Sequence, residues 1–338
     1  MRYDRTIYLA GTGAWLPEPS PLGPEAEAGR VSEHHRSLGY ESIAVAGDVA
    51  GAEMAVRAAR TAVRRSGLGA AGIDLVLHAS LGFQGVEWWP AASWIASQSA
   101  GPGAVAFDVQ QRSNGGLGAL HLAAAQLASG AAGTALITTG DNFAPPYVDR
   151  WAMQFHTIYG DAGTAVVLST RAGFARLKST VTFADTSLEP FSRGGTPFAL
   201  VPGTGPVPLL QRFIAQSRTP EAAGAWDRLE TVMLRARDTA LADAGLRTGD
   251  IARVVVPNVH RGNGRPENYD ALGFGERQSV WEFGRRVGHL GAGDQFAGLN
   301  HLVEEKGAGV GDHVLLFGVG VGYTVSAAVL EITGTPPL

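Results

Sequence analysis

The stretch AFDVQQRSNGGLG, residues 106–118, joins a predicted β-strand to a predicted α-helix. Residues 103–109 are mostly small, apolar or β-branched, as in a buried strand, and residues 121–129 are alanine-rich without proline, as in a helix. Ser113 lies at the junction, where the unpaired amides and the positive dipole end of the helix favour the oxyanion of an acyl intermediate. We interpret this stretch as an active-site elbow with Ser113 as the candidate nucleophile.

Ser113 also has a simpler interpretation. Serine is a preferred N-cap residue, so its side chain can merely cap the helix that follows. Gly115, Gly116 and Gly118 behind it allow another backbone or a substrate to approach closely. Both interpretations stay open on the sequence of this stretch.

Length and composition indicate a globular chain with a large core. The chain has 338 residues, 45% of them hydrophobic, which is enough for one two-part domain or two domains. Small and polar residues interrupt every apolar run before it reaches transmembrane length, and residues 1–5 lack the apolar core of a signal peptide. We therefore expect a cytoplasmic protein that does not bind a membrane.

The absence of cysteine restricts the chemistry. Without cysteine the chain has no disulfide, thiolate ligand or thiolate nucleophile, so covalent catalysis has to use an oxygen, an amine or an imidazole. The scattered Lys and Arg residues and the formal net charge of -4 argue against a nucleic-acid-binding surface. We predict no metal site, because several histidines show no metal-binding spacing with carboxylates: His34, His35, His78, His121, His156, His301 and His313.

We infer an internal duplication of the chain. A predicted helix at residues 50–66 ends at Gly67 and leads to a short strand at 73–78. A shift of 178 residues superimposes six identities: Thr61, Ala62, Gly67, Leu68, Ile73 and Val76 on Thr239, Ala240, Gly245, Leu246, Ile251 and Val254. Both halves also end in a glycine-containing turn beside an apolar strand. We predict two halves, residues 1–172 and 173–338, whose α/β sheets pack on shared helices, and a surface loop at residues 18–40.

Four motifs, in order along the chain, resemble the thiolase superfamily and within it the ketoacyl-acyl-carrier-protein synthase III branch. They are Gly11–Gly13 with Leu16 and Pro17, Ala106–Val109 followed by the nucleophile position, Tyr159–Gly163, and Gly318–Thr324. The resemblance covers nearly the full length. It implies an α/β, thiolase-like fold of duplicated halves in a five-layered arrangement, and a homodimer whose sheets join across a two-fold axis.

The chain departs from this family at the predicted site. Ser113 stands where members usually have a cysteine, and His289 stands where the family has an asparagine in a Gly-Asn motif. A serine hydroxyl needs an adjacent base, so His289 is the candidate base and Asp294, five residues later, the candidate residue that orients it. His289 can instead be a buried histidine satisfied by a carbonyl, and Asp294 can cap a helix beginning near Gln295.

The resemblance implies further site residues. The amides of Ser113 and Val321 would form an oxyanion hole, although residues 320–322 can also be an ordinary glycine turn. The family's second histidine should follow the strand at 253–257; His260 is nearby but displaced, so its role stays open. Either residues 82–94, with three tryptophans, or residues 191–213 could line an acyl tunnel.

Three functions fit these observations. The favoured one is an acyltransferase that accepts an acyl group on Ser113 from coenzyme A or from the phosphopantetheine of an acyl carrier protein, with no permanently bound cofactor. It passes the group to a hydroxyl, an amine or a second carrier thiol, as in secondary metabolism of the polyketide and antibiotic type. The alternatives are a condensing enzyme that decarboxylates a malonyl unit with His260, and a noncatalytic partner subunit that keeps the fold.

Overall fold

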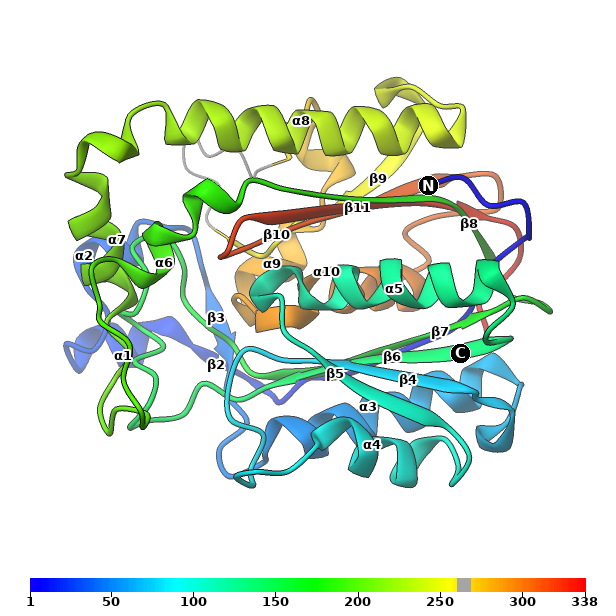
Figure 1. The fold of residues 1–338 in the computed structure, drawn as a ribbon, viewed down its shortest axis with the longest axis horizontal. Helices are drawn as coiled ribbons and strands as arrows, with labels where there is room; N and C mark the ends of the chain where they lie inside the picture. Colours follow the sequence, from blue (N-terminus) through cyan, green and yellow to red (C-terminus); the bar gives the residue numbers. More distant parts are fainter. Residues whose placement is uncertain (260–268) are drawn as a thin grey trace.

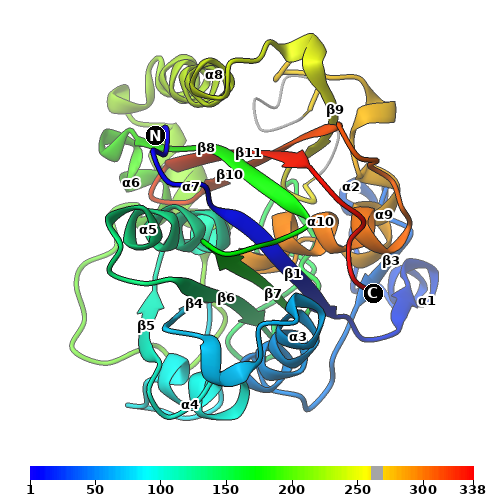
Figure 2. The ribbon, with the colours of Figure 1, turned by 90° about the vertical axis from the view of Figure 1, so that its right-hand side faces the viewer.

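Two layers of β-strands with helices between and outside them organise the chain, as the computed structural model of residues 1–259 and 269–338 shows (Figures 1 and 2). Helices α5 (Gly115–Ser129) and α10 (Asp294–Glu304) lie between the strand layers. Helices α3 (Gly51–Ser66) and α4 (Ala91–Ser99) cover one outer face, and α8 (Ala225–Ala244) covers the other. The five-layered α/β arrangement predicted from the sequence is confirmed.

Within the described residues, the strands form a nine-stranded sheet in the order β5-β4-β6-β7-β1-β8-β11-β10-β9. Strands β5, β4 and β6 are parallel, as are β10 and β9, and the other neighbours are antiparallel. The two layers meet where β1 pairs briefly with β8. The strands are β1 (Tyr8–Trp15), β4 (Leu75–Ala79), β5 (Val105–Val109), β6 (Thr134–Asp141), β7 (Ala162–Ser169), β8 (Ala175–Ala184), β9 (Ile251–Val255), β10 (His313–Gly320) and β11 (Thr324–Ile332).

Each helix layer has its own hydrophobic core. The central cluster joins Leu117, Leu120 and Leu127 of α5 to Phe296 and Leu299 of α10. A second cluster packs α8 on the outer face of the β8–β11 layer, and a third packs α3 and α4 on the outer face of the other layer. Because the central helices are covered on both sides by strands, the residues at their N-termini are held rigidly inside the molecule.

The two repeats have matching elements. Helices α3 and α8 both end at a glycine in the left-handed conformation, Gly67 (φ 67°) and Gly245 (φ 73°), as the sequence predicts. Each helix is followed by a strand, β4 or β9. The boundary at 172/173 falls in the connection between β7 and β8. The division into halves at that residue stays a prediction.

Two sequence-based predictions about local structure are wrong. Residues 18–40 are not a continuous loop: they contain β2 (Pro19–Pro21), α1 (Leu22–Glu27) and α2 (Glu33–Arg36), and β3 (Ser42–Ala44) pairs with β2. These elements are too short to produce a period. Strand β5 is not buried, because it lies at the edge of the sheet with Val105 and Phe107 more than half exposed.

Helix α5 begins at Gly115, earlier than the predicted segment at 121–129. Glycine is a weak helix former, but close packing requires it here. A Cβ atom at Gly116 would lie 2.6 Å from the carbonyl oxygen of Ala292, and one at Gly115 would lie 2.9 Å from the Cβ of Ala79. The predicted close approach of another backbone is confirmed. Among the described residues, no helix combines the length and the apolar character needed to cross a membrane.

Candidate active site

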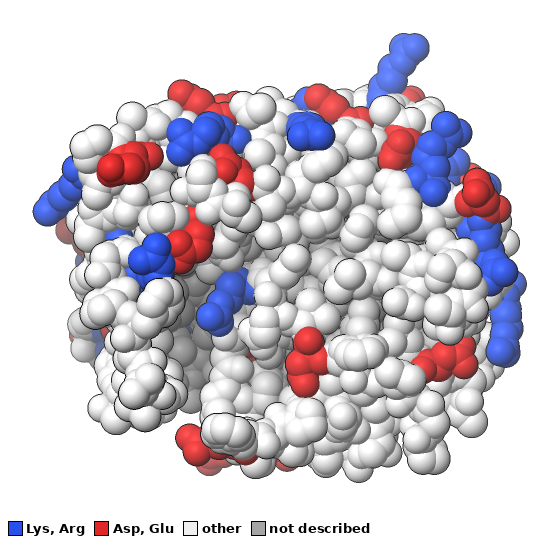
Figure 3. Space-filling view, viewed as in Figure 1, with Lys and Arg blue, Asp and Glu red and all other residues white. Residues whose placement is uncertain are grey.

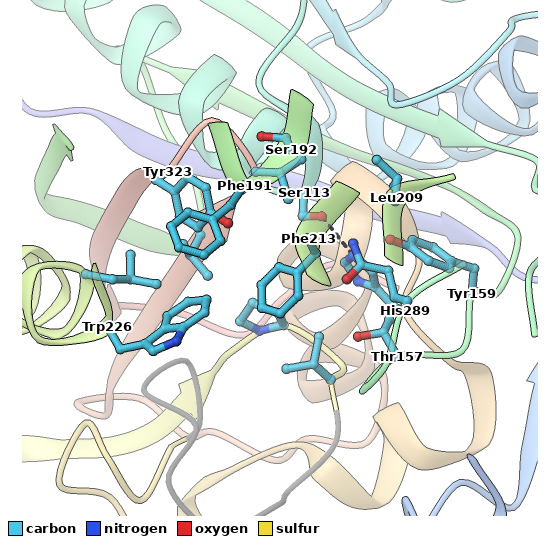
Figure 4. Close-up of a pocket in the computed structure, with 17 residues that line it drawn as sticks. Ser113, Thr157, Tyr159, Phe191, Ser192, Leu209, Phe213, Trp226, His289 and Tyr323 are labelled. Carbon is cyan, nitrogen blue, oxygen red and sulfur yellow. Dashed lines mark hydrogen bonds between the residues drawn. The ribbon is translucent and has the colours of Figure 1, made fainter. Parts of the chain in front are cut away.

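Ser113, His289 and Asp294 form a continuous hydrogen-bonded chain. Figure 4 shows its first bond, between Ser113 and His289. Ser113 lies in a 3₁₀ turn, Arg112–Asn114, directly before α5, and His289 lies in the connection between α9 (Trp281–Val287) and α10. The Oγ of Ser113 is 2.8 Å from Nε2 of His289, and Nδ1 of His289 is 2.5 Å from Oδ2 of Asp294. The structure therefore brings the three sequence-predicted residues into mutual contact; their catalytic roles stay a prediction.

The surroundings of Asp294 determine the direction of these hydrogen bonds. Its buried carboxylate accepts the backbone N–H of Leu290 on Oδ1 (2.7 Å) and that of Asn258 on Oδ2 (2.8 Å). A carboxylate held by N–H donors is an acceptor, so Nδ1 of His289 carries the proton and Nε2 has a free lone pair. Nε2 can then accept the hydrogen of the Ser113 hydroxyl.

The structure contradicts the simpler interpretations, in which Ser113 and Asp294 cap helices and His289 bonds to a backbone carbonyl. The N-cap of α5 is Asn114, while the Ser113 hydroxyl is bonded to His289. The N-cap of α10 is Gly293, while the Asp294 carboxylate bonds to groups before the helix and to Asn258. The His289 ring contacts a hydroxyl and a carboxylate instead of a backbone carbonyl.

The backbone of His289 is fixed by residues 158–160, which overlap the start of the motif at residues 159–163. The N–H of His289 donates to the carbonyl of Ile158 (2.9 Å), and the N–H of Gly160 donates to the carbonyl of His289 (2.9 Å). The Tyr159 ring lies 5.1 Å from the imidazole, centroid to centroid. A Cβ atom at Gly160 would lie 1.9 Å from the carbonyl oxygen of Val287, so glycine is required for this approach.

A pocket opens beside Ser113 and His289 (Figure 4). Residues from α6 (Pro190–Arg193), α7 (Leu209–Ser217) and α8 form an aromatic wall, while Gln154 and Thr157 contribute polar groups. Three other aromatic residues have ring centroids 5.4 to 6.1 Å from the ring centroid of Phe191; they are Phe213, Trp226 and Tyr323. Of the two predicted acyl-binding segments, residues 191–213 contribute to this pocket. Trp89 and Trp94 instead pack near α3 and α4.

Val321 and His260 are the other two residues that the sequence predicts for the site. Val321 lines the same pocket as Ser113, and a Cβ atom at Gly320 would lie 2.4 Å from the carbonyl oxygen of Gln111. The turn after β10 therefore contacts the elbow, as an oxyanion hole would require, and that role stays a prediction. His260 lies outside the described residues.

Sequence reasoning assigned no role to four residues of this region. Tyr159, Trp226 and Tyr323 line the pocket, and Asn258 contacts Asp294. Asn258 directly follows Pro257, close to the place where the resemblance puts the family's second histidine, so its position in the sequence could have drawn attention to it. Tyr159 and Tyr323 lie inside two of the four motifs, which could have drawn attention to them, whereas Trp226 carries no local pattern that separates it from core residues.

The buried carboxylate of Asp141 supports the turn between His289 and Asp294. Its Oδ2 accepts the N–H of Ala292 (3.1 Å), and its Oδ1 accepts those of Leu81 (2.6 Å) and Gly82 (3.2 Å). Burial raises the pKa of Asp141 to about 7, although these three N–H groups oppose the shift. Asp141 thus links the strand layer at β6 to the backbone that carries the site.

We expect Asp141 to make the free energy of unfolding depend on pH. An unfolded aspartate ionises near pH 4, so between about pH 4 and pH 7 the folded state holds the additional proton. Stability from this residue should therefore decrease as the pH rises through that window, by up to roughly 4 kcal/mol. Urea unfolding at pH 5 and pH 8 should show a smaller decrease for Asp141→Asn than for the wild type. Equal pH dependence in both proteins would contradict the shift.

Residues 107–186 match the family 3-oxoacyl-[acyl-carrier-protein] synthase III, and residues 241–332 match its C-terminal domain. The chain is similar to the solved structure of ChlB3, described as an acyltransferase, with 35% identity, a TM-score of 0.92 and coverage of 98% of this chain and 99% of ChlB3.

Two bacterial 3-oxoacyl-(acyl carrier protein) synthase III structures share the fold. The enzyme of Pseudomonas aeruginosa has 22% identity and a TM-score of 0.77, covering 98% of this chain and all 100% of that one. The enzyme of Aquifex aeolicus has 19% identity and a TM-score of 0.78, covering 96% and 99%. These likenesses show a common thiolase-like fold.

Proposed function

The chain belongs to the 3-oxoacyl-[acyl-carrier-protein] synthase III family of the thiolase superfamily and is an acyl-transferring or condensing enzyme, and we propose that it is an acyltransferase with Ser113 as its nucleophile. The observation that carries this proposal is the Ser113–His289–Asp294 chain, with 2.8 Å from Oγ to Nε2. This arrangement has the nucleophile, base and orienting group of a catalytic triad.

Acylation begins when Oγ of Ser113 attacks the thioester carbonyl carbon of the donor. Nε2 of His289 takes the hydroxyl proton, and Asp294 stabilises the imidazolium through Nδ1. The carbon–sulfur bond then breaks, the leaving thiolate takes the proton from Nε2, and the acyl group remains as an ester on Ser113. The N–H groups of Ser113 and Val321 would stabilise the oxyanion, assisted by the dipole of α5.

Transfer reverses these proton movements. The acceptor hydroxyl, amine or thiol attacks the ester carbonyl while Nε2 of His289 takes its proton. The bond from the carbonyl carbon to Oγ breaks, and His289 returns the proton to Ser113. His289 therefore has to be neutral at the start of each half-reaction, and Asp294 holds the tautomer that leaves Nε2 unprotonated.

The donor in this proposal is acyl-coenzyme A or an acyl carrier protein, so no permanently bound cofactor is needed. The relative ChlB3 is described as an acyltransferase, and the synthase III relatives are named for acyl carrier protein substrates. Both support a thioester donor. A cytoplasmic location and a place in secondary metabolism of the polyketide and antibiotic type are parts of the same proposal. In the described residues, no group of three or more His, Asp or Glu side chains is arranged to hold a metal ion.

The experiment that tests the proposal is intact-protein mass spectrometry after incubation with a panel of acyl-coenzyme A and acyl-carrier donors. A persistent mass increase equal to one acyl group is expected with the true donor, and peptide mapping should place it on Ser113. An adduct on another residue would contradict the assignment of the nucleophile.

We further propose a homodimer that forms through the β5 edge. The strand order ends at β5, where Val105 and Phe107 are exposed, and the half-exposed Leu122 lies on the adjacent helix α5. Figure 3 shows few charged side chains over β5 and α5. An apolar edge strand with unpaired backbone groups is a site for pairing with a second copy.

The dimer proposal predicts the effect of a charge in this strand. Phe107→Glu should convert the dimer to a monomer, because a carboxylate would be buried without a partner at the joined edge. Val310→Glu, at a comparably exposed valine outside β5, is the matched control and should stay dimeric. Light scattering at micromolar concentration measures both. A monomeric wild type would contradict the proposal.

A further inference from the structure

Asn258 follows β9 and contacts both Asp294 and the residue before His289. Asn258 is 2% exposed. Its backbone N–H donates to Oδ2 of Asp294 (2.8 Å), the oxygen that also accepts from Nδ1 of His289. Its Nδ2 donates to the carbonyl oxygen of Gly288 (3.1 Å), and its own carbonyl accepts from the Tyr40 hydroxyl (2.8 Å). Asn258 is thus fixed at three points beside the triad.

The Gly288–His289 peptide is held at both of its polar atoms. Nδ2 of Asn258 binds its oxygen, and its N–H donates to the carbonyl of Ile158 (2.9 Å). Rotation of the peptide plane would leave a buried polar group without a hydrogen-bond partner, which is unfavourable. Gly288 has φ 80°, a conformation that favours glycine. Because this peptide sets the direction of the His289 side chain, it also determines where Nε2 lies relative to Ser113.

Helix α9 leaves space for the Asn258 side chain. A Cβ atom at Gly284 would lie 2.5 Å from Oδ1 of Asn258, so this position has to be glycine. Glycine is less favourable than alanine inside a helix. Helix α9 therefore carries a less favourable helix residue, Gly284, at the point where the buried Asn258 amide needs space beside the site.

We propose that Asn258 is a positioning residue that holds His289 in line with Ser113 for proton transfer. It acts through the Gly288 carbonyl and Asp294, not through the acyl group. The inference rests on the proposed function of His289 as the general base. It adds a fourth residue, from the connection after β9, to the three residues that the sequence identifies.

Two substitutions separate this role from simple packing. Asn258→Ala removes the donor to Gly288, whereas Asn258→Asp keeps the volume but directs an acceptor at the Gly288 carbonyl. If the donor matters, the Asp variant should lose more activity than the Ala variant; if only packing matters, the order should reverse. We expect the transfer rate from acylated Ser113 to fall about 10- to 100-fold in the Asp variant, with KM for the donor nearly unchanged.

A second readout needs no acyl donor. The hydrogen-bonded Nδ1–H of His289 should give a downfield proton NMR signal, assigned by its loss in His289→Asn, and it should shift or broaden in both Asn258 variants. Asn300→Ala is the matched control, because Asn300 is also buried but bonds to Thr12 and Arg65. Its signal and transfer rate should match the wild type.

The outcomes distinguish the two proposals. An Asn258→Asp protein with the wild-type transfer rate and an unmoved Nδ1–H signal would overturn the positioning role. If the wild type carries no acyl group on Ser113, the acyltransferase proposal fails, but the NMR comparison still decides whether Asn258 positions His289.

Discussion

Ser113→Ala is expected to give a folded protein that forms no acyl adduct and transfers acyl groups more slowly by a factor on the order of 10⁴ to 10⁶. The reason is the loss of the only attacking oxygen in the proposed mechanism, and His289 cannot replace it. The free energy of unfolding should change by less than about 1 kcal/mol, because the Ser113 hydroxyl bonds to His289 and the N-cap of α5 is Asn114. Intact-protein mass and urea unfolding measure the two effects separately.

Ser192→Ala is the matched control for this experiment. Ser192 lines the same pocket, but its hydroxyl donates to the carbonyl of Glu189. The control should load the acyl group at the normal yield. If Ser113→Ala also loads at the normal yield, the nucleophile is another residue.

His289→Asn, which restores the residue that the family resemblance implies, should reduce acyl transfer by a factor of about 10² or more. Asparagine has no ring nitrogen to accept the Ser113 proton, so the general base is lost. His121→Asn is the control, since His121 lies within α5 and its Nδ1 is hydrogen-bonded to Thr180 of β8. Acyl transfer should be measured under single-turnover conditions, where loading and transfer are separate steps. A His289→Asn enzyme with the wild-type rates would contradict the base assignment.

The same variants distinguish transfer from condensation. A condensing enzyme stabilises the carbanion left by decarboxylation, so the wild type should be tested for carbon dioxide release from malonyl donors. We expect none, and we expect His260→Ala to change acyl transfer much less than His289→Asn. Carbon dioxide release in step with a new ketone, abolished by His260→Ala and spared by His289→Asn, would show that this is a condensing enzyme. Loss of acyl loading with no condensation would favour the noncatalytic alternative.

The layered fold was predictable from the family resemblance of the four motifs, and several helix ends were predictable from local patterns. The helix at α3 ends at Gly67 and the helix at α8 at Gly245 because left-handed glycines terminate helices, and this signal survives in both repeats. The exposure of β5 and the presence of the short helices α1 and α2 were less predictable from the sequence. Helices α1 and α2 are held by tertiary contacts, with Leu22 and His35 buried, and the exposure of β5 follows from its place in the strand order.

The amino-acid sequence by itself determined which chemical groups are available: a serine at the elbow, no cysteine in the chain, and a histidine five residues before an aspartate. Only the tertiary structure decided that Ser113 and His289, separated by 176 residues, lie 2.8 Å apart. It also decided that Asn258 shares the Asp294 carboxylate with His289. The physical reason is that local patterns encode helices and turns, whereas contacts between distant segments depend on how the two strand layers pack against α5 and α10.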